Sequence, residues 1–393
     1  MDILAKAYNW TEADLVREMG LYPWFLPLED TEGTEVVVEG RKILMIGSNN
    51  YLGLTTDPRV REAAIEAVKR YGTSCTGSRF LNGTLALHQE AEERLAAYVD
   101  MEAALVFSTG YQVNLGTISA IIGRGDVVVL DKDDHASIVD GAMLALGDTR
   151  RFTHNDMEHL DRVLGKIDDE TGVLVVVDGV YSMGGDVAPL PEIIPVVKKH
   201  KARLMVDDAH SIGVMGGGRG TPHHFGVTED VDLIMGTFSK SFASLGGFIA
   251  GDAKVMDYLQ HHARSFMFSA SMPASNVATV LAALDIMENE PEHVERLWEV
   301  TERMRSGLKE MGFEMGPSTT PIIPIIVGEM DKTFMAWKMC FEAGLYTNAV
   351  IAPAVPPDKG LLRTSYMATH TDEQIDRALN ILGEVGRELE LIE

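Results

Sequence analysis

Short apolar runs that alternate with helical patterns through the middle of the chain limit its fold more than any other feature. Each run is too short for a helix and is bounded by turn residues, as expected of a buried strand. A strand that repeatedly leads into a helix indicates βαβ units, which build a mostly parallel sheet covered by helices, with ligands at the carboxyl ends of the strands. The predicted strands are residues 103–107, 126–130, 172–177, 203–206 and 232–235.

The chain is too long for one small core, because its 393 residues suit two or three packed subdomains. The pattern changes near Asn289-Glu290-Pro291-Glu292, after which long helices and a few strands follow. We predict an N-terminal arm and hairpin over residues 1–57, a large α/β domain over residues 58–288, and a smaller C-terminal α+β domain over residues 289–393.

Both ends of the chain carry local structural signals. Residues 1–27 predict a short helical arm, with Thr11 at a helix start. Two apolar runs flank Glu39-Gly40-Arg41 and predict a hairpin. Thr371-Asp372-Glu373-Gln374 is typical of a capping box that begins a closing helix.

Charge and cysteine content exclude several classes of function. The chain has 34 Lys and Arg against 59 Asp and Glu, a net charge of -25, which disfavours nucleic acid or an anionic membrane as the main partner. Its two cysteines, Cys75 and Cys340, lie far apart, so neither a disulfide framework nor a cysteine-rich metal site is expected. No stretch approaches the roughly 20 apolar residues of a membrane span, and no signal sequence is visible. We therefore expect a cytoplasmic protein without a metal.

Lys240 stands alone in a region without other charges. It follows the predicted strand at residues 232–235, and no charged residue lies near it between Asp232 and Asp252. This isolation indicates a desolvated amine, and burial lowers the pKa of a lysine and frees it to attack a carbonyl carbon. The alternative is a lysine at a strand end whose amine reaches water.

Asp207 and His210 follow another predicted strand and suggest a particular cofactor. Pyridoxal phosphate requires a carboxylate beside its ring nitrogen and a hydrogen-bond donor beside its phenolic oxygen. Asp207 and His210 suit these two roles, although either alone would more often be a cap or turn residue. Gly110 and Tyr111 begin a helix after a strand, where backbone N–H groups can bind a phosphate, but this signal is weak by itself. His135 and Ser182 follow two further strands; a loop histidine in such a place is more often solvated.

Together, these motifs resemble the α-oxoamine synthases. The resemblance rests on Gly236-Thr237-Phe238-Ser239-Lys240, on Asp207 and His210, on His135-Ala136-Ser137-Ile138, and on residues 181–186, and it runs from about Gly33 to the C-terminus. These enzymes depend on pyridoxal 5'-phosphate, have the aspartate aminotransferase fold (fold type I), and condense an amino acid with an acyl-CoA while releasing CO2.

The resemblance implies a role for each motif residue. Lys240 would bond to the cofactor aldehyde, Asp207 would pair with its ring nitrogen, and His135 would stack on its ring. His210 and Ser182 would contact the phenolic oxygen. The positions that match phosphate ligands are Gly110, Tyr111, Thr237 and Ser239, and those that match ligands of the substrate carboxylate are Arg363 and either Asn49 or Asn50.

The resemblance also implies partners and substrates. Family members are homodimers that share the active site, so Ser269 to Ser271 would contact the phosphate bound by the other subunit. Residues 77–85, 236–241 and 345–357 look most like bacterial members that join L-serine to palmitoyl-CoA and form 3-ketosphinganine. Such a lipid substrate suggests transient membrane contact.

Three alternatives stay open at this point. One is the ligase that joins glycine to acetyl-CoA, since several bacterial ligases share the Asn-Gly-Thr-Leu and His-Ala-Ser-Ile runs, and another is 8-amino-7-oxononanoate synthase. Residues 353–357, Pro-Ala-Val-Pro-Pro, depart from the Pro-Pro-Ala-Thr-Pro form of some members, which leaves the acyl-chain preference open. The third is an inactive regulatory subunit, but such subunits typically lack the lysine that is present here.

Overall fold

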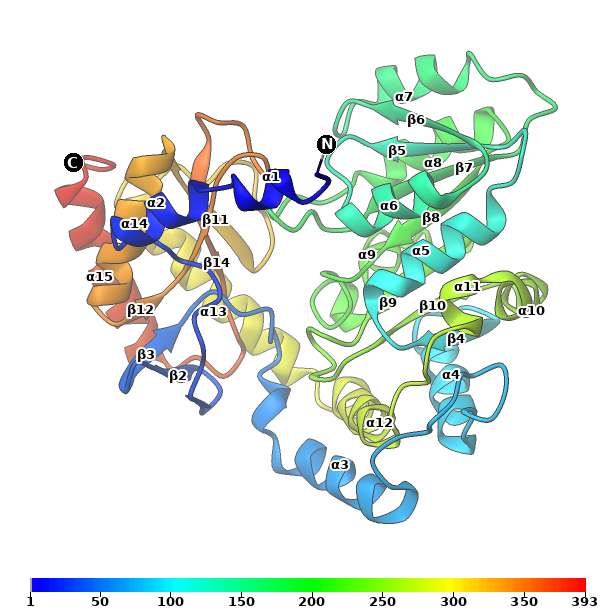
Figure 1. Ribbon diagram of the computed structural model, residues 1–393, viewed down its shortest axis with the longest axis horizontal. Helices are drawn as coiled ribbons and strands as arrows, with labels where there is room; N and C mark the ends of the chain where they lie inside the picture. The colour runs from blue at the N-terminus through cyan, green and yellow to red at the C-terminus, as the bar shows by residue number, and fades with distance from the viewer. Residues whose placement is uncertain (1) are drawn as a thin grey trace.

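A seven-stranded sheet forms the centre of the larger part of the computed structural model, which describes residues 2–393 (Figure 1). Its strand order is β4-β10-β9-β8-β7-β5-β6. β10 is antiparallel to both neighbours, and all the other pairs are parallel, which confirms the predicted mostly parallel sheet. The bounds are β4 (Ala103–Phe107), β5 (Val127–Asp131), β6 (Asp148–Phe152), β7 (Val173–Asp178), β8 (Arg203–Asp207), β9 (Leu233–Thr237) and β10 (Gly247–Gly251).

Both faces of this sheet are buried, each in its own apolar core. Successive residues of a strand point to opposite faces, so Val128 and Leu130 contact one core while Val127 and Val129 contact the other. This explains why the strands read as continuous apolar runs. One face is covered by α5 (Gly110–Ile121), α6 (Ala136–Leu144), α10 (Ala253–His262) and α11 (Arg264–Met267), and the other mainly by α4 (Ala86–Tyr98), α7 (Met157–Leu164), α8 (Leu190–Lys199) and α12 (Ala274–Asn289), against which α3 (Pro58–Tyr71) packs.

Two small sheets form the other part of the molecule (Figure 1). One is antiparallel, with the order β11-β14-β13, and the other has the order β1-β2-β3-β12. Because β12 pairs in parallel with β3, the N-terminal hairpin joins a sheet with a C-terminal strand. The bounds are β1 (Asp30–Thr31), β2 (Glu35–Val38), β3 (Arg41–Met45), β11 (Ile322–Gly328), β12 (Leu345–Tyr346), β13 (Asn348–Val350) and β14 (Gly360–Ser365).

A single core connects the hairpin with the C-terminal helices. Val38 and Leu44 of the hairpin belong to the same buried cluster as Met304, Trp337 and Leu382. The division at residues 57 and 288 remains our proposal, with the first and third segments sharing this core. The helices concerned are α13 (Glu292–Glu310), α14 (Met330–Glu342) and α15 (Asp372–Glu388).

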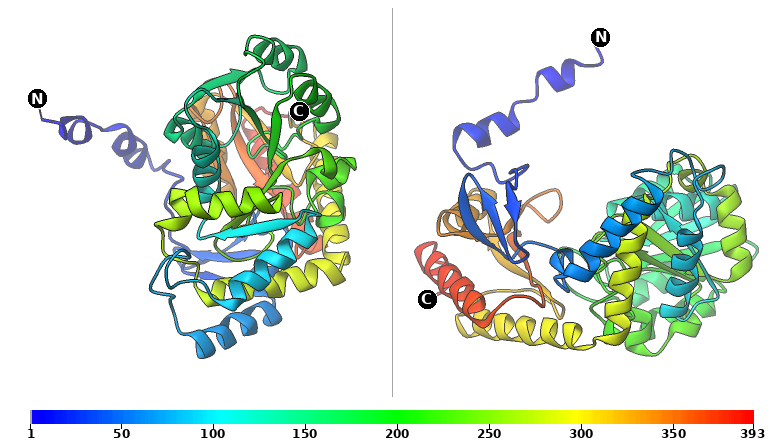
Figure 2. Two further views of the ribbon diagram at one scale, coloured as in Figure 1. Left: turned by 90° about the vertical axis from the view of Figure 1, so that its right-hand side faces the viewer. Right: turned by 90° about the horizontal axis from the view of Figure 1, so that it is seen from below.

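The N-terminal arm extends away from the rest of the chain (Figure 2). It contains α1 (Ala5–Tyr8) and α2 (Glu12–Glu18), as the predicted helical arm requires, while Met1 lies outside the described residues. Thr11 occupies the cap position of α2, but its side chain makes no capping hydrogen bond. At the other end, the capping box of α15 forms, because the hydroxyl of Thr371 accepts from the backbone of Gln374 and the side chain of Gln374 accepts from Thr371 N–H.

The remaining helices are short. They are α9 (Thr221–Phe225) and three 3-10 helices at Leu54–Thr56, Gly216–Gly218 and Thr228–Asp230. Among residues 2–393, no helix is both long enough and apolar enough to cross a membrane.

Candidate active site

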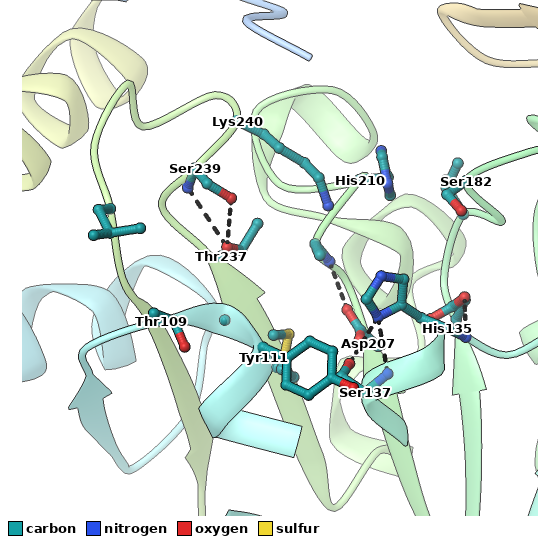
Figure 3. A pocket seen from close by; sticks show the side chains of 16 residues that line it. Thr109, Tyr111, His135, Ser137, Ser182, Asp207, His210, Thr237, Ser239 and Lys240 are labelled. Atoms are coloured by element: carbon teal, nitrogen blue, oxygen red, sulfur yellow. Dashed lines mark hydrogen bonds between the residues drawn. The ribbon is translucent and has the colours of Figure 1, made fainter. Parts of the chain in front are cut away.

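A cavity of about 310 Å³ lies at the carboxyl ends of the central strands, where ligands bind in sheets of this kind (Figure 3). Lys240 reaches into it after β9, opposite His135 and His210 (Figure 3). The structure thus brings together nine residues singled out from the sequence: Gly110, Tyr111, His135, Ser182, Asp207, His210, Thr237, Ser239 and Lys240.

The amine of Lys240 is prepared for nucleophilic attack. Burial lowers its pKa from 10.5 to about 8, although the nearby carboxyl groups of Asp207 and Asp178 act in the opposite direction. A lysine with this pKa has an appreciable unprotonated fraction near neutral pH. The isolation of Lys240 in the sequence predicts such a desolvated amine.

Asp207 is oriented by two hydrogen bonds beneath the cavity. The side chain is only 4% exposed. One carboxylate oxygen accepts from Asn114 Nδ2 at 2.7 Å, and the other accepts from the backbone of Ala209 at 3.0 Å. A buried carboxylate is costly unless a positive group faces it, and the cavity provides the room for one.

Asn114 was not singled out from the sequence. Its amide also donates to the hydroxyl of Ser137 at 2.8 Å, so it ties α5 to the start of α6 directly below Asp207. An asparagine is unfavourable inside a helix unless its side chain has a partner elsewhere, and this was the one available signal.

His135 caps α6 and presents its ring to the cavity. Its Nδ1 lies 2.7 Å from the hydroxyl of Ser137, and its backbone N–H donates to Asp178 at 3.1 Å. Burial lowers the pKa of His135, so the ring is neutral near pH 7. Burial also raises the pKa of Asp178 well above its usual value. A neutral imidazole held in this way can stack on an aromatic cofactor.

His210 is hydrogen-bonded to Tyr51, a residue that no sequence motif marks. The Tyr51 hydroxyl lies 2.7 Å from His210 Nδ1, and the tyrosine side chain is wholly buried. Burial lowers the pKa of His210 well below its usual range and raises that of Tyr51 to about 12, so both are neutral at pH 7. The hydrogen bond leaves Nε2 as the ring nitrogen free to meet a ligand.

The start of α5 and the end of β9 form a site suited to a phosphate. A Cβ atom on Gly110 would lie 2.5 Å from Thr237 Oγ1, so only glycine allows this close approach. The hydroxyls of Thr237 and Ser239 lie 3.0 Å apart beside the first turn of α5. Backbone N–H groups at a helix start together with two hydroxyls are suitable partners for an anion.

Arg363 and the two candidate asparagines lie outside the residues that line the cavity. Arg363 on β14 donates from Nη2 to the side-chain oxygen of Asn49 at 2.9 Å and from Nε to the backbone oxygen of Ser182 at 2.6 Å. Asn50 instead donates to the hydroxyl of Thr55 at 2.8 Å. Of the two alternatives left by the sequence, Asn49 is therefore the one joined to Arg363.

Ser269 to Ser271 also lie outside the cavity lining of their own chain. The hydroxyl of Ser269 accepts from Gln112 Nε2 at 3.1 Å, and that of Ser271 donates to the backbone oxygen of Gly77 at 3.0 Å. The segment therefore lies beside the first turn of α5, outside the site that this chain forms alone.

These residues fit pyridoxal phosphate. They combine a lysine with a lowered pKa, a buried carboxylate, a neutral imidazole, and an anion site where Gly110 leaves no room for a side chain. Within residues 2–393, no group of three or more His, Cys, Asp or Glu side chains has the arrangement of a metal site.

Comparison with known proteins assigns the family. The model of aminotransferase class I and II matches residues 41–382. The chain belongs to this family. Serine palmitoyltransferase of Sphingobacterium spiritivorum is 51% identical over 377 residues, which cover 96% of this chain and 94% of that protein. The enzyme of the same name from Bacteriovorax stolpii is 50% identical over 377 residues, 95% of this chain and 90% of that protein.

Other relatives narrow the class of enzyme. An 8-amino-7-oxononanoate synthase of Symbiobacterium thermophilum is 41% identical over 383 residues, 97% of this chain and 98% of that protein. Among solved structures, a serine palmitoyltransferase variant of S. paucimobilis with a bound aldimine of pyridoxal phosphate and myriocin matches with a TM-score of 0.97, 38% identity and complete coverage of both chains. The chain is thus a pyridoxal-phosphate-dependent enzyme of the α-oxoamine synthase type, with the fold that the sequence predicts.

Proposed function

We propose that this enzyme condenses L-serine with a long-chain acyl-CoA, palmitoyl-CoA in the first instance, to give 3-ketosphinganine, CoA and CO2. The observation that carries this proposal is the identity of 51% and 50% to two serine palmitoyltransferases over nearly the whole chain. The geometry supports it, because the chain has the lysine, carboxylate and histidines that an active member needs around one cavity. The presence of these residues around one cavity also argues against an inactive regulatory subunit.

The cofactor supplies the chemistry that no side chain has. Pyridoxal phosphate offers an aldehyde carbon for an amine and a ring that withdraws electrons from the neighbouring carbon. In this chain, Asp207 would keep the proton on the ring nitrogen, and His210 and Ser182 would donate to the phenolic oxygen. The neutral ring of His135 would stack on the cofactor, and Gly110, Tyr111, Thr237 and Ser239 would hold the phosphate.

Lys240 would transfer the proton that starts the reaction. Its pKa of about 8 allows the amine to accept a proton from the amino acid Cα near neutral pH and to return one at the end of the cycle. Nucleophilic attack by that carbon on the thioester carbonyl breaks the bond to sulfur and releases CoA. Loss of CO2 from the resulting β-keto acid completes the condensation.

Arg363 and Asn49 would bind the carboxylate of the amino acid. Arg363 Nε is occupied by Ser182 and Nη2 by Asn49, so the guanidinium has a fixed orientation. A fixed guanidinium can donate two hydrogen bonds to a carboxylate, which would direct the Cα proton toward Lys240.

A second candidate is the reaction of an 8-amino-7-oxononanoate synthase, favoured by the relative that is 41% identical. This candidate and the glycine-using alternative differ from the proposed reaction in the amino acid and in the acyl chain that they use. An apolar pocket distinguishes each methylene by only roughly 1–3 kcal/mol, so the acyl chain has to be determined by experiment.

The proposed working form is a homodimer in the cytoplasm, with transient membrane contact when a lipid substrate is used. Two observations support the dimer: Ser269 to Ser271 lie outside the cavity of their own chain, and apolar side chains are exposed beside them. Both cysteines are unpaired, in keeping with a reducing compartment.

The deciding experiment is an absorption titration of the protein loaded with pyridoxal phosphate, using L-serine, glycine and L-alanine in turn. We expect a saturable change in the visible spectrum at the lowest concentration with L-serine, and CoA release when palmitoyl-CoA is then added. A response confined to glycine or L-alanine would transfer the proposal to a short-chain reaction.

Lys240→Ala is the matched control for this titration. The variant keeps Asp207 and the phosphate site but lacks the amine. Before any amino acid is added, we expect it to lack the visible band of a cofactor bonded to lysine, and after both substrates are added we expect no CoA release. A variant that kept both would contradict the role of Lys240.

A further inference from the structure

A charged cluster that the proposed reaction does not use lies beside the cavity, between the ends of β5 and β7. His154 follows β6, and its ring lies between two carboxylates: Nδ1 is 2.9 Å from Asp131 and Nε2 is 2.7 Å from Asp186. Asp131 is almost wholly buried and Asp186 is 9% exposed. Asn155 strengthens the cluster, because its backbone donates to Asp131 at 3.0 Å and its side chain to Asp186 at 3.2 Å.

His154 can satisfy both carboxylates only when both ring nitrogens carry protons. Burial by itself lowers the pKa of His154, but the hydrogen bonds to Asp131 and Asp186 outweigh it and raise the pKa to about 10. The ring is therefore a cation at neutral pH that joins two anions. Without it, Asp131 and Asp186 would repel each other in a partly buried position.

Asp186 ends a tight loop, residues 181–186, that the cluster holds at its base. The backbone N–H of Tyr181 donates to the backbone oxygen of Asp186 at 3.0 Å, and that of Gly185 donates to the backbone oxygen of Tyr181 at 2.9 Å. The ring of Tyr181 meets that of His154 edge-on, with the ring centres 4.3 Å apart. His154 thus contacts the first and the last residue of the loop.

The far side of the same loop faces the site. Ser182 lines the cavity, and its backbone oxygen accepts from Arg363 Nε at 2.6 Å. The backbone oxygen of Gly185 accepts from the hydroxyl of Thr320 at 2.9 Å. The loop therefore connects the seven-stranded sheet, through His154, with the segment before β11 and with β14 of the three-stranded sheet.

We propose that His154 is a positioning residue: by joining Asp186 to Asp131 it fixes loop 181–186, and through the Ser182 carbonyl it fixes the orientation of Arg363 toward the amino acid carboxylate. This inference rests on the proposed role of Arg363 as the carboxylate ligand. It assigns His154 to substrate orientation and not to proton transfer, because its two nitrogens are occupied by carboxylates.

The test compares His154→Gln with His200→Gln in the protein loaded with pyridoxal phosphate. Glutamine can bond to one of the two carboxylates but cannot supply two N–H donors along opposite directions. His200 is a matched control, because it also pairs with a carboxylate, Asp161 at 2.6 Å, at the end of α8. We expect His154→Gln to raise KM for L-serine about tenfold, equivalent to about 1.4 kcal/mol, with little change in kcat, and His200→Gln to leave both unchanged.

A second readout follows the loop without any turnover. Amide hydrogen exchange at Tyr181 and Gly185 should become at least about tenfold faster in His154→Gln and stay unchanged in His200→Gln.

A third test uses the Arg363→Lys background, in which His154→Gln should raise KM much less than in the wild type, because both changes act on one guanidinium. If His154→Gln does not fold, Asp186→Asn removes one of the two charged bonds and takes its place.

Each outcome decides the proposal. Unchanged exchange at the loop, or a KM effect that is the same with and without Arg363, would overturn it. If the wild type binds glycine or L-alanine but not L-serine, the proposed substrate is wrong, and the same comparison is then made with the amino acid that binds. Faster exchange without any change in KM would also refute the link from His154 to Arg363.

Discussion

At the scale of single residues, the site depends on groups whose ordinary ionisation is changed by burial. Lys240, His135 and His210 all have lowered pKa values, so the cavity contains a reactive amine and two neutral imidazoles near pH 7. Burying a charged amine costs free energy, so a protonated Lys240 destabilises the folded protein when no cofactor is bound. This cost makes the stability of the cofactor-free protein depend on pH.

The lowered pKa of Lys240 predicts a gain in stability as the pH rises. Between pH 8 and 10.5 the unfolded lysine binds a proton that the folded one has lost, so the free energy of unfolding increases through this window. From pH 7 to pH 9, the cofactor-free wild type should gain about 1 kcal/mol relative to Lys240→Met. Denaturant unfolding at both pH values measures this. Lys254→Met, at the exposed start of α10, should behave as the wild type, and equal pH dependence in wild type and Lys240→Met would contradict the lowered pKa.

At the scale of elements, the strands with continuous apolar sequence were predictable and the others were not. The predicted strand 103–107 coincides with β4, and the other four agree with β5, β7, β8 and β9 to within a residue or two. β6 is an edge strand with the sequence Asp-Thr-Arg-Arg-Phe. Its exposed charged residues leave no apolar run from which a strand could be predicted. The run at β10 is apolar, but nothing local indicates that it pairs antiparallel between β4 and β9.

The residues of the site divide in the same way. Those at strand ends, such as Asp207 and Lys240, could be identified because each follows a recognisable strand. Tyr51 carries no such signal, and Asn114 carries only the weak signal of an asparagine inside a helix. The partners of both lie far away in sequence: His210 for Tyr51 and Asp207 for Asn114. The choice between Asn49 and Asn50 likewise required the position of Arg363 on β14.

The close approach of the end of β9 to the start of α5 predicts a steric requirement for glycine. Gly110→Ala would place a Cβ atom 2.5 Å from Thr237 Oγ1 and displace the hydroxyl proposed to hold the phosphate. We expect the dissociation constant of pyridoxal phosphate to increase at least about tenfold, a loss of about 1.4 kcal/mol, measured by fluorescence titration. The control is Gly165→Ala, since Gly165 has φ −64 and its nearest neighbour is 3.2 Å from the added atom. Unchanged affinity in Gly110→Ala would argue against a phosphate at this junction.

At the scale of the whole molecule, the site joins parts that are distant in the chain. Tyr51 of the N-terminal segment bonds to His210 of the large sheet unit, and Arg363 of β14 bonds to Ser182. The lining of the cavity comes from the large sheet unit alone. The residues proposed to bind substrate therefore lie on β14 and on the loop after the hairpin, and those proposed to bind the cofactor lie around the seven-stranded sheet.

One apolar surface, next to the end of the cavity proposed to hold the phosphate, predicts where the two chains of the proposed homodimer meet. Leu81 and Phe268 are 78% and 73% exposed. An isolated antiparallel β-bridge between Ser78 and Ala270 places their two segments side by side. Neighbouring exposed apolar side chains favour an interface over a free surface. We expect Leu81→Asp combined with Phe268→Asp to convert a dimer into a monomer in sedimentation and to weaken pyridoxal phosphate binding, because Ser269 to Ser271 would no longer reach the neighbouring site. Met335→Asp, at another exposed apolar position on α14, should leave the dimer intact. A double variant that stayed dimeric would place the interface elsewhere, and a monomer with unchanged cofactor affinity would show that each site is complete within one chain.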